Sequence, residues 1–344
     1  MSKQASLYLV IGVLGLAAPL AAPSFHAQLA LLWIMITIAL SWDVMGGQMG
    51  YNSFGNIIFF GVGMYTTAVM QVGLFYDGGA YNQAQGAAGF ALTHGQYYGG
   101  LLAGLALARV MGSVLAMVLG SGMLGLRGHY FAIGTLGLGI AFAEIFAGWD
   151  WVGAGSGMVT PLYPDGGWIS RTLLFYYLAF VLGVACFLTL KRLYATRFGL
   201  AINAIRDDED KAEAMGLHTT RYKTVAWSIS AFFTGIAGGI VGFIDPRDVA
   251  FVGITYGVWM ILMAILGGKG TIWGPVIGAV IFHIMQELFW TYLLGWQRVA
   301  LGLLIVIIVV FFPSGILGYL RERYPERFGV KVDAPDAASG EGRG

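Results

Sequence analysis

The sequence predicts an all-α polytopic membrane protein with about ten transmembrane helices and with both termini in the cytoplasm. The 344 residues are 58% hydrophobic and 11% charged, whereas soluble domains carry about 25% charged residues. The mean hydropathy is +0.74, and the apolar stretches are too long and too closely spaced for separate globular cores. One transmembrane domain is therefore predicted over residues 1–318, followed by a partly disordered cytoplasmic tail at 319–344.

Candidate spans are stretches of about 20 mainly apolar residues, the length at which a helix crosses a bilayer. The first is the weakest, because Lys3, the apolar run from Leu7 to Leu20 and the small residues at 21–22 also resemble a signal sequence. A retained span is favoured, and a signal sequence is the alternative. The ten segments are 7–22, 27–45, 54–76, 97–119, 129–148, 172–190, 224–244, 251–267, 275–294 and 299–318.

The distribution of Lys and Arg predicts the orientation, because basic residues in short loops stay preferentially on the cytoplasmic side. With the N-terminus inside, fifteen of the nineteen basic residues lie on the inner side, three on the outer side and one, Arg109, within a span. The first long loop, 77–96, contains no Lys or Arg. The long charged loop 191–223 is therefore predicted to face the cytoplasm, provided that the span count is even.

Glycine is frequent, at 53 residues, and much of it forms small-xxx-small pairs within spans. Such pairs let helix backbones approach closely where lipid offers no hydrophobic drive for association. Three glycine-rich breaks, at 46–50, 120–128 and 267–274, predict either turns or unwound helices that line a cavity. The pairs are Gly100 with Gly104, Gly235 with Gly239, Gly238 with Gly242 and Gly274 with Gly278.

No pattern in the sequence predicts catalysis or a cofactor bound by this chain. The 268–271 stretch is not a nucleotide-binding loop, because a P-loop has Gly where Met263 stands and Ser or Thr where Gly270 stands. The five histidines are dispersed, and Cys186 is the single cysteine, so neither a metal site nor a disulfide within the chain is predicted. A net charge of +1 creates no field that would attract nucleic acid.

Four charged side chains fall inside predicted spans, where charge is costly, and three of them, Arg109, Glu144 and Glu287, suggest function. Arg109 lies near the middle of its span and Glu144 toward the outer end of the next, so pairing between antiparallel helices is favoured over a role in a pathway. Glu287 lies four residues after His283, within reach of a local hydrogen bond. Asp43, near the inner end of its span, is interpreted as reaching the membrane interface.

The loop 191–223 contains two short helical pieces. Asp207 or Asp208 is placed to cap a helix with an acidic first turn, and Gly216 is placed to end it. Apolar residues on a water-facing loop need a surface to bury against. A protein partner is favoured over lipid headgroups, because anionic lipid would repel the acidic centre at 207–210. The apolar residues are Ala201, Ile202, Ala204 and Ile205 before the cap, and Ala212, Ala214, Met215 and Leu217 after it.

This loop resembles that of the permease subunits of ABC importers for branched-chain amino acids, specifically the M-type (LivM-like) half of the permease pair. Residues 198–206 and 209–216 are similar to the cytoplasmic motif with which the family docks its ATPase subunit. Further matches run in order from about residue 40 to 318. They are Phe59 to Thr66 (FFGVGMYT), Leu126 to Leu136 (LRGHYFAIGTL), Leu266 to Pro275 (LGGKGTIWGP), and Phe312-Pro313 with Gly315.

The resemblance implies a multi-pass subunit of the bacterial inner membrane. Its implied partners are a homologous H-type permease subunit, two ABC ATPase subunits that bind ATP and Mg²⁺, a periplasmic substrate-binding protein and membrane lipid. This chain itself would bind no cofactor, no metal and no nucleic acid. The residues that the resemblance assigns to ATPase coupling are Ala201, Ala204, Ile205, Arg206, Glu209, Ala212, Met215 and Gly216.

Three departures from the family pattern stand out. Asn56 stands where relatives usually have His, Met64 stands where they usually have Ala, and Lys269 interrupts the glycine motif. If Asn56 lies near the pathway, the substrate could differ from leucine, isoleucine and valine. Related permeases serve urea, short amides and other small acids, so the substrate class transfers more safely than its identity. The candidate pathway residues are Asn56, Arg109, Glu144 and Glu287.

The implied function is ATP-driven translocation of a branched-chain amino acid, or of a related small amino acid or amide, by alternating access. The alternative is a stand-alone secondary transporter or channel. Coupling to an ion gradient would then require an intramembrane carboxylate such as Glu144 or Glu287.

Overall fold

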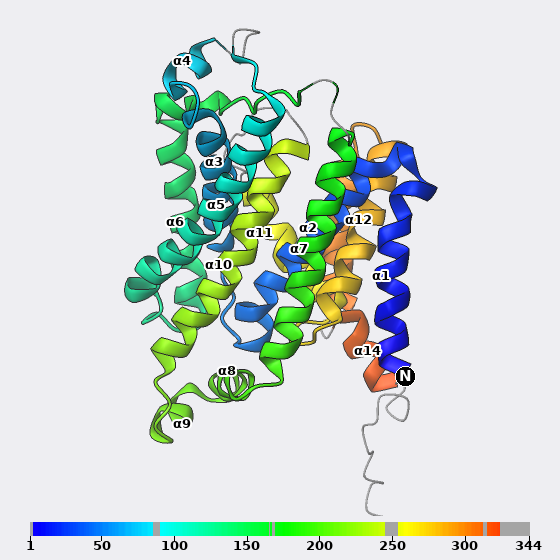
Figure 1. The fold of residues 1–344 in the computed structure, drawn as a ribbon. Helices are drawn as coiled ribbons and strands as arrows, with labels where there is room; N and C mark the ends of the chain where they lie inside the picture. Colours follow the sequence, from blue (N-terminus) through cyan, green and yellow to red (C-terminus); the bar gives the residue numbers. More distant parts are fainter. Residues whose placement is uncertain are drawn as a thin grey trace, which may run out of the picture.

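In a computed structural model of the chain, the structure describes residues 3–84, 90–164, 166, 169–244, 254–311 and 315–323. Within these residues every regular element is a helix, as predicted, and the long helices form one bundle (Figure 1). The α-helices are α1 (Lys3–Ala21), α2 (His26–Asp43), α3 (Asn56–Gly73), α4 (Gly78–Gln83), α5 (His94–Met123), α6 (His129–Ala147), α7 (Arg171–Tyr194), α8 (Arg197–Asp207), α9 (Glu209–Ala214), α10 (Thr219–Ile244), α11 (Ile254–Gly267), α12 (Gly274–Tyr292), α13 (Gln297–Phe311) and α14 (Gly315–Arg323).

Six helical segments in the described part of the chain are long and apolar enough to cross a membrane. They contain α2, α3, α5, α6, α7 and α10, and shorter apolar helices occupy Ile11–Ala21 and Thr255–Gly267. The chain is thus a multi-pass membrane protein. Each of the ten predicted segments overlaps a helix, but the number that cross the bilayer stays a prediction.

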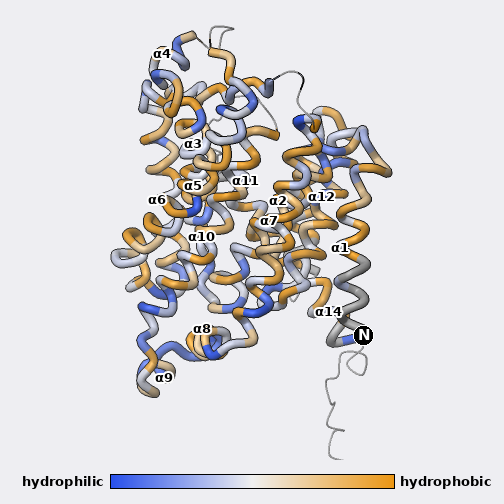
Figure 2. Tube along the Cα trace, in the orientation of Figure 1, coloured by the Kyte–Doolittle hydropathy of each residue, from blue (hydrophilic) through white to orange (hydrophobic). Residues whose placement is uncertain are grey.

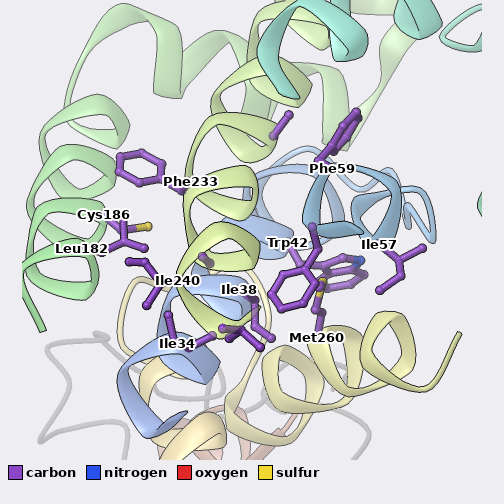
Figure 3. Packing of buried hydrophobic residues seen from close by; sticks show 14 of the residues in the cluster. Ile34, Ile38, Trp42, Ile57, Phe59, Leu182, Cys186, Phe233, Ile240 and Met260 are labelled. Atoms are coloured by element: carbon purple, nitrogen blue, oxygen red, sulfur yellow. The ribbon is translucent and has the colours of Figure 1, made fainter. Parts of the chain in front are cut away.

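Helices α3 and α10 lie in the centre of the bundle, and α5 packs extensively on both of them. Helix α2 packs beside α7, α10, α11 and α12, whereas α6 and α1 lie at opposite sides of the molecule (Figure 1). Side chains from α2, α3 and α11, among them Trp42, Phe59 and Met260, fill the space next to α10 (Figure 3).

Glycines set the spacing of the central helices, which confirms the packing role predicted for the small-residue pairs. A methyl group added at Gly238 of α10 would lie 2.0 Å from the carbonyl oxygen of Phe60 in α3. One added at Gly104 of α5 would lie 2.9 Å from the backbone of Thr67. Only glycine allows backbones to approach so closely. Methyl groups added at Gly100, Gly235, Gly239, Gly274 and Gly278 would likewise lie within 3.0 Å of another residue.

Two of the glycine-rich breaks interrupt helices at the same end of the bundle. After α2 the chain forms a π-helical turn, η2 (Val44–Gln48), and leaves the helix at Gly50, which has a φ of +78°. The segment between α11 and α12 turns through Gly268 and Gly270, with φ values of +117° and +78°. The third break, 120–128, covers the last turn of α5 and the connection at 124–128 to α6.

Hydrophilic residues gather at the ends of the bundle, and most densely on α8 and α9 (Figure 2). The apolar middle of the long helices corresponds to the membrane-facing part of the chain. The predicted C-terminal tail lies outside the described residues from 324 onward. The first predicted span is α1, which is held against α7 by a hydrogen bond from the Tyr176 hydroxyl to the carbonyl oxygen of Gly15.

Candidate functional site

The charged loop 191–223 folds as two short helices, α8 and α9, with the caps that the sequence predicts. Asp208 caps α9, and its carboxylate accepts a hydrogen bond from the backbone N–H of Lys211 at 3.0 Å. Gly216, with a φ of +87°, ends α9. Its N–H bonds the Glu213 carbonyl at 2.8 Å, and the next N–H, of Leu217, bonds the Ala212 carbonyl at 3.1 Å. This pair of bonds is the Schellman arrangement.

The apolar face of α8 is buried within this chain, contrary to the expectation that it waits for a partner. Ala201, Ile202 and Ile205 are 6%, 0% and 2% exposed, because α8 packs on α7, η2 and α10. Ala212 of α9 is 1% exposed. Three of the predicted coupling residues, Ala201, Ile205 and Ala212, therefore anchor the two helices to the bundle.

A buried ion pair ties α9 to the start of α10. The Lys223 side chain is 2% exposed, and its Nζ donates to Glu209 Oε1 at 2.7 Å and to the Leu124 carbonyl oxygen at 2.8 Å. Its third contact is the Tyr51 hydroxyl, at 3.2 Å. That hydroxyl in turn donates to Glu209 Oε2. The three donors of the ammonium are thus all engaged, as a buried lysine requires.

Arg127 forms ion pairs with three acidic residues of α9. Its guanidinium nitrogens lie 2.5 Å from Asp210, 3.7 Å from Glu209 and 3.6 Å from Glu213. Glu213 also accepts a hydrogen bond from the Thr219 hydroxyl at 2.5 Å. Much of the acidic centre of the loop is therefore neutralised by basic residues of the same chain.

The C-terminal end of α8 contacts both broken segments of the bundle. A methyl group added at Gly50 would lie 3.0 Å from Arg206 Cγ, and one added at Gly270 would lie 3.7 Å from Arg206 Nη1. The end of α2 also bonds the second break, because the N–H of Gly270 donates to Asp43 Oδ1 at 2.8 Å. We call Asp43, Gly50, Arg206 and Gly270 the junction. Asp43 is 1% exposed, so the expectation that it reaches the membrane interface is wrong, since its carboxylate is bonded inside the protein.

Protonation of Glu209 is expected to weaken the attachment of α9. Burial alone would raise the pKa of Glu209, but hydrogen bonds from Lys223 and Tyr51 outweigh it and hold the pKa below the ordinary value of 4.5. A carboxyl group with a lowered pKa contributes stability above its unfolded-state pKa and loses it as the pH falls through the folded-state pKa. The thermal unfolding midpoint of the wild type should therefore fall more steeply below pH 4.5 than that of Glu209→Gln. Parallel pH profiles for the two proteins would contradict this.

Two apolar side chains of the α8–α9 segment remain uncovered. Leu200 is 70% exposed and Met215 is 76% exposed. Met215 lies next to a surface groove of about 550 Å³ lined by Glu213 and residues 216–221. Of the predicted coupling residues, Arg206, Met215 and Gly216 are therefore exposed to a partner, and Ala204 is partly exposed. Leu200, which the prediction omits, is exposed as well.

The predicted intramembrane pairs do not form. Arg109 and Glu144 are both exposed, and among the described residues neither takes part in an ion pair. Their helices α5 and α6 touch only slightly, which explains why the two side chains do not meet. His283 is buried, and its Nδ1 has no hydrogen-bond partner in the described part of the chain, so it does not bond Glu287 through that atom.

Asn56 lies in the core between α3 and α10. It is 1% exposed, its Nδ2 donates to the Ser230 hydroxyl at 2.8 Å, and its Oδ1 accepts from Trp227 Nε1 at 3.3 Å. The amide thus ties two central helices together. Its role in a pathway stays a prediction, as do those of Arg109, Glu144 and Glu287.

Sequence reasoning missed the residues that hold the α8–α9 segment in place. Tyr51, Arg127 and Lys223 lie in three separate segments, and the prediction treats Lys223 only as the boundary of the loop. Arg127 belongs to the LRG stretch of the family pattern (126–128), so the resemblance could have pointed to it as a functional residue. Within the described residues no group of three or more His, Cys, Asp or Glu side chains is arranged to hold a metal ion.

A bundle of apolar helices long enough to cross a bilayer, with a polar two-helix segment anchored at one end, defines a multi-pass integral membrane protein. A family model described as the permease component of branched-chain amino acid transport systems matches residues 25–310. The chain belongs to this family of permease components, and it is a transport subunit rather than an enzyme.

Characterised relatives support the M-type assignment. The chain is 28% identical to the high-affinity branched-chain amino acid transport system permease protein LivM of Salmonella typhimurium, over 86% of this chain and 76% of that protein. It is also 28% identical to LivM of Escherichia coli K12, over 85% and 73%. LivH of Salmonella typhimurium is 24% identical, over 82% of this chain and 90% of its own length. No solved structure matches the chain significantly.

Proposed function

We propose that the chain translocates branched-chain amino acids, or a related small amino acid or amide, as one permease subunit of an ABC importer in a bacterial inner membrane. Its partners would be a homologous H-type permease subunit, two ATPase subunits and a periplasmic substrate-binding protein. ATP and Mg²⁺ would be bound by the ATPase subunits. The observation that carries the proposal concerns the α8–α9 segment. Its apolar face is buried against the bundle, whereas Leu200 and Met215 are exposed on its surface.

The proposed topology has ten spans, with both termini and the α8–α9 segment in the cytoplasm. Two observations support it. Arg127, Lys191 and Lys223 lie at or near the α8–α9 end of the bundle, and basic residues favour the cytoplasmic side. The N-terminal end of α1 also lies at the α8–α9 end of the bundle (Figure 1). With an even number of spans, the C-terminus would lie on the same side of the membrane as the N-terminus.

The proposed mechanism passes ATPase motion through two sets of contacts. Movement of α8 would be transmitted through the junction, where Arg206 touches both the α2 break and the α11–α12 turn. Movement of α9 would be transmitted through Glu209 and Lys223 to α10, which packs on α3 and α5. Because close-packed helices move as units, small shifts at these contacts would tilt spans and alternate access to the pathway.

The double variant Leu200→Asp, Met215→Asp is expected to detach the ATPase while leaving the permease folded. Both side chains are exposed, so the folded state loses little, whereas interface residues of this type cost more than about 1 kcal/mol each when they are hot spots. Co-purification of ATPase subunits and ATP-driven uptake should fall by about tenfold or more.

Leu162→Asp is the matched control, because Leu162 is 74% exposed in the loop between α6 and α7. It should leave ATPase co-purification unchanged. Uptake by proteoliposomes that contain this chain without any ATPase would instead favour a stand-alone transporter or channel. The ligand of the binding protein encoded beside the permease would identify the cargo.

A further inference from the structure

The candidate spans differ widely in how much of their surface this chain covers. About 78% of the apolar window is buried in the segments containing α2, α3 and α10, but only 28% in α5 and 17% in α6. Helix α6 lies at one side of the molecule (Figure 1), where it packs on α3 and touches α5 only slightly. An apolar helix with so little protein contact faces either lipid or another subunit.

Arg109 is incompatible with a lipid-facing position. Helix α5 has 30 residues, and is therefore about 45 Å long. Arg109 lies at its midpoint, exposed, with no ion-pair partner in the described part of the chain. Lys and Arg side chains reach the headgroups only from near helix ends. A charge at this depth must therefore meet protein or water once the transporter is assembled.

Two other helices with large exposed apolar residues, α1 and α7, carry no such charge. The exposed residues of α1 and α7, such as Leu14 and Val181, are 62% and 61% exposed. Neither 4–21 nor 172–190 contains Asp, Glu, Lys or Arg, as expected of helices that face lipid. Among these four helices, exposed charge within a predicted span is found on α5, with Arg109, and on α6, with Glu144; on α12, Glu287 is partly buried.

Helix α6 has a second feature that its own chain does not explain. A methyl group added at Gly137 would find no atom within 4 Å, unlike those at the central glycines. Gly137 lies on the exposed stripe of α6 together with Ile133, Ile140 and Glu144. Small residues on exposed helix faces allow close approach of another transmembrane helix.

From these observations we propose that the exposed stripes of α5 and α6 form the contact surface for the second, homologous permease subunit. We call this the α5–α6 surface; it includes Val110, Arg109, Gly137, Ile140 and Glu144. Its occupant presents a carboxylate to Arg109, because an ammonium or guanidinium group buried at an interface requires one. The proposal rests on the proposed function, which supplies the second permease.

Lipid accessibility of spin labels tests the surface. In a Cys186→Ala background, nitroxides at Val110→Cys and Ile140→Cys are compared with one at Val181→Cys, which is near mid-span on α7 and 61% exposed against 49% and 42%. Collisions with O₂ should be similar at all three sites in the chain alone. In the assembled transporter they should drop at positions 110 and 140 and stay unchanged at 181.

The outcomes decide the proposal independently of transport activity, because the measurement requires the assembled permease complex but no substrate uptake. Continued O₂ access at 110 and 140 in the complex would mean that the surface faces lipid and would overturn it. Access by a water-soluble nickel chelate would mean an aqueous pathway rather than a contact, and would also overturn it. If Val110→Cys does not insert, Val114→Cys, also 49% exposed and one turn further along, replaces it.

The charge itself is tested by Arg109→Met and Arg109→Lys. Removing one partner of a buried interfacial charge pair should weaken association of the two permeases by about 30-fold or more, whereas Lys should retain most of it. Recovery of the second permease on this chain, measured against a dilution series, gives the readout. Equal recovery with Met and with Arg would overturn the proposed pairing.

Discussion

Replacing Lys223 by Met is expected to release α9 from the bundle and to lower the free energy of unfolding by about 3–5 kcal/mol, the range for breaking a buried ion pair from one side. The change leaves the Glu209 carboxylate buried with one fewer donor, and it leaves the Leu124 carbonyl without the ammonium that now bonds it at 2.8 Å. Unfolding by SDS in mixed micelles measures the loss. Transport should fall with it, because α9 would no longer be tied to α10.

Lys211→Met is the matched control in the same loop. The side chain of Lys211 is 83% exposed and pairs with Asp208 at 2.9 Å, and exposed pairs of this kind are worth about 0–1 kcal/mol. A double variant sharpens the test, because Lys223→Met leaves the Glu209 carboxylate without its ion-pair partner and Glu209→Gln removes that unpaired charge. Lys223→Met with Glu209→Gln should therefore be less destabilised than the sum of the two single variants. Strict additivity would show that the two groups do not interact.

Replacing Gly63 by Ala is expected to separate the central helices α3 and α10. The added methyl group would lie 2.0 Å from the carbonyl oxygen of Gly235, so the backbones themselves must move. Overpacking of this kind costs about 1–3 kcal/mol, and occasionally more, in a well-packed interior. The same SDS unfolding measurement should show this loss, together with a lower thermal unfolding midpoint.

Gly73→Ala on the same helix provides the comparison. Nothing lies within 4 Å of a methyl group added at Gly73, and alanine is the better helix former. This variant should equal the wild type in stability or exceed it slightly. If both variants were equally harmless, close backbone approach at Gly63 would not be holding the two helices at their present distance.

The helical architecture was predictable because a membrane span must satisfy its own backbone hydrogen bonds, and composition alone reveals such stretches. The caps of α9 at Asp208 and Gly216 were predictable for a similar reason, since capping depends on residues a few positions apart. The glycine pairs at 235–239 and 238–242 also indicated helix contact, although they did not indicate that α3 is the partner.

Hydrogen-bond and ion-pair partners that lie far apart in the sequence were not predictable from such local patterns. The carboxylate of Asp43 bonds Gly270, 227 residues later, and the Lys223 ammonium contacts Tyr51, 172 residues earlier. Pairing rules between neighbouring spans suggested Arg109 with Glu144 instead. That pairing fails because α5 and α6 touch only slightly, so both charges stay exposed.

The loop 191–223 shows which features follow from the local sequence and which depend on the tertiary structure. Spacing and composition decide that it carries two capped helices with apolar residues, because those properties depend on near neighbours in the chain. Only the tertiary structure decides which of its groups are satisfied inside the protein, as Glu209 and Ile205 are, and which remain available to another subunit, as Met215 does. The physical reason is that burial and ion pairing depend on distances between segments remote in sequence, which no local pattern specifies.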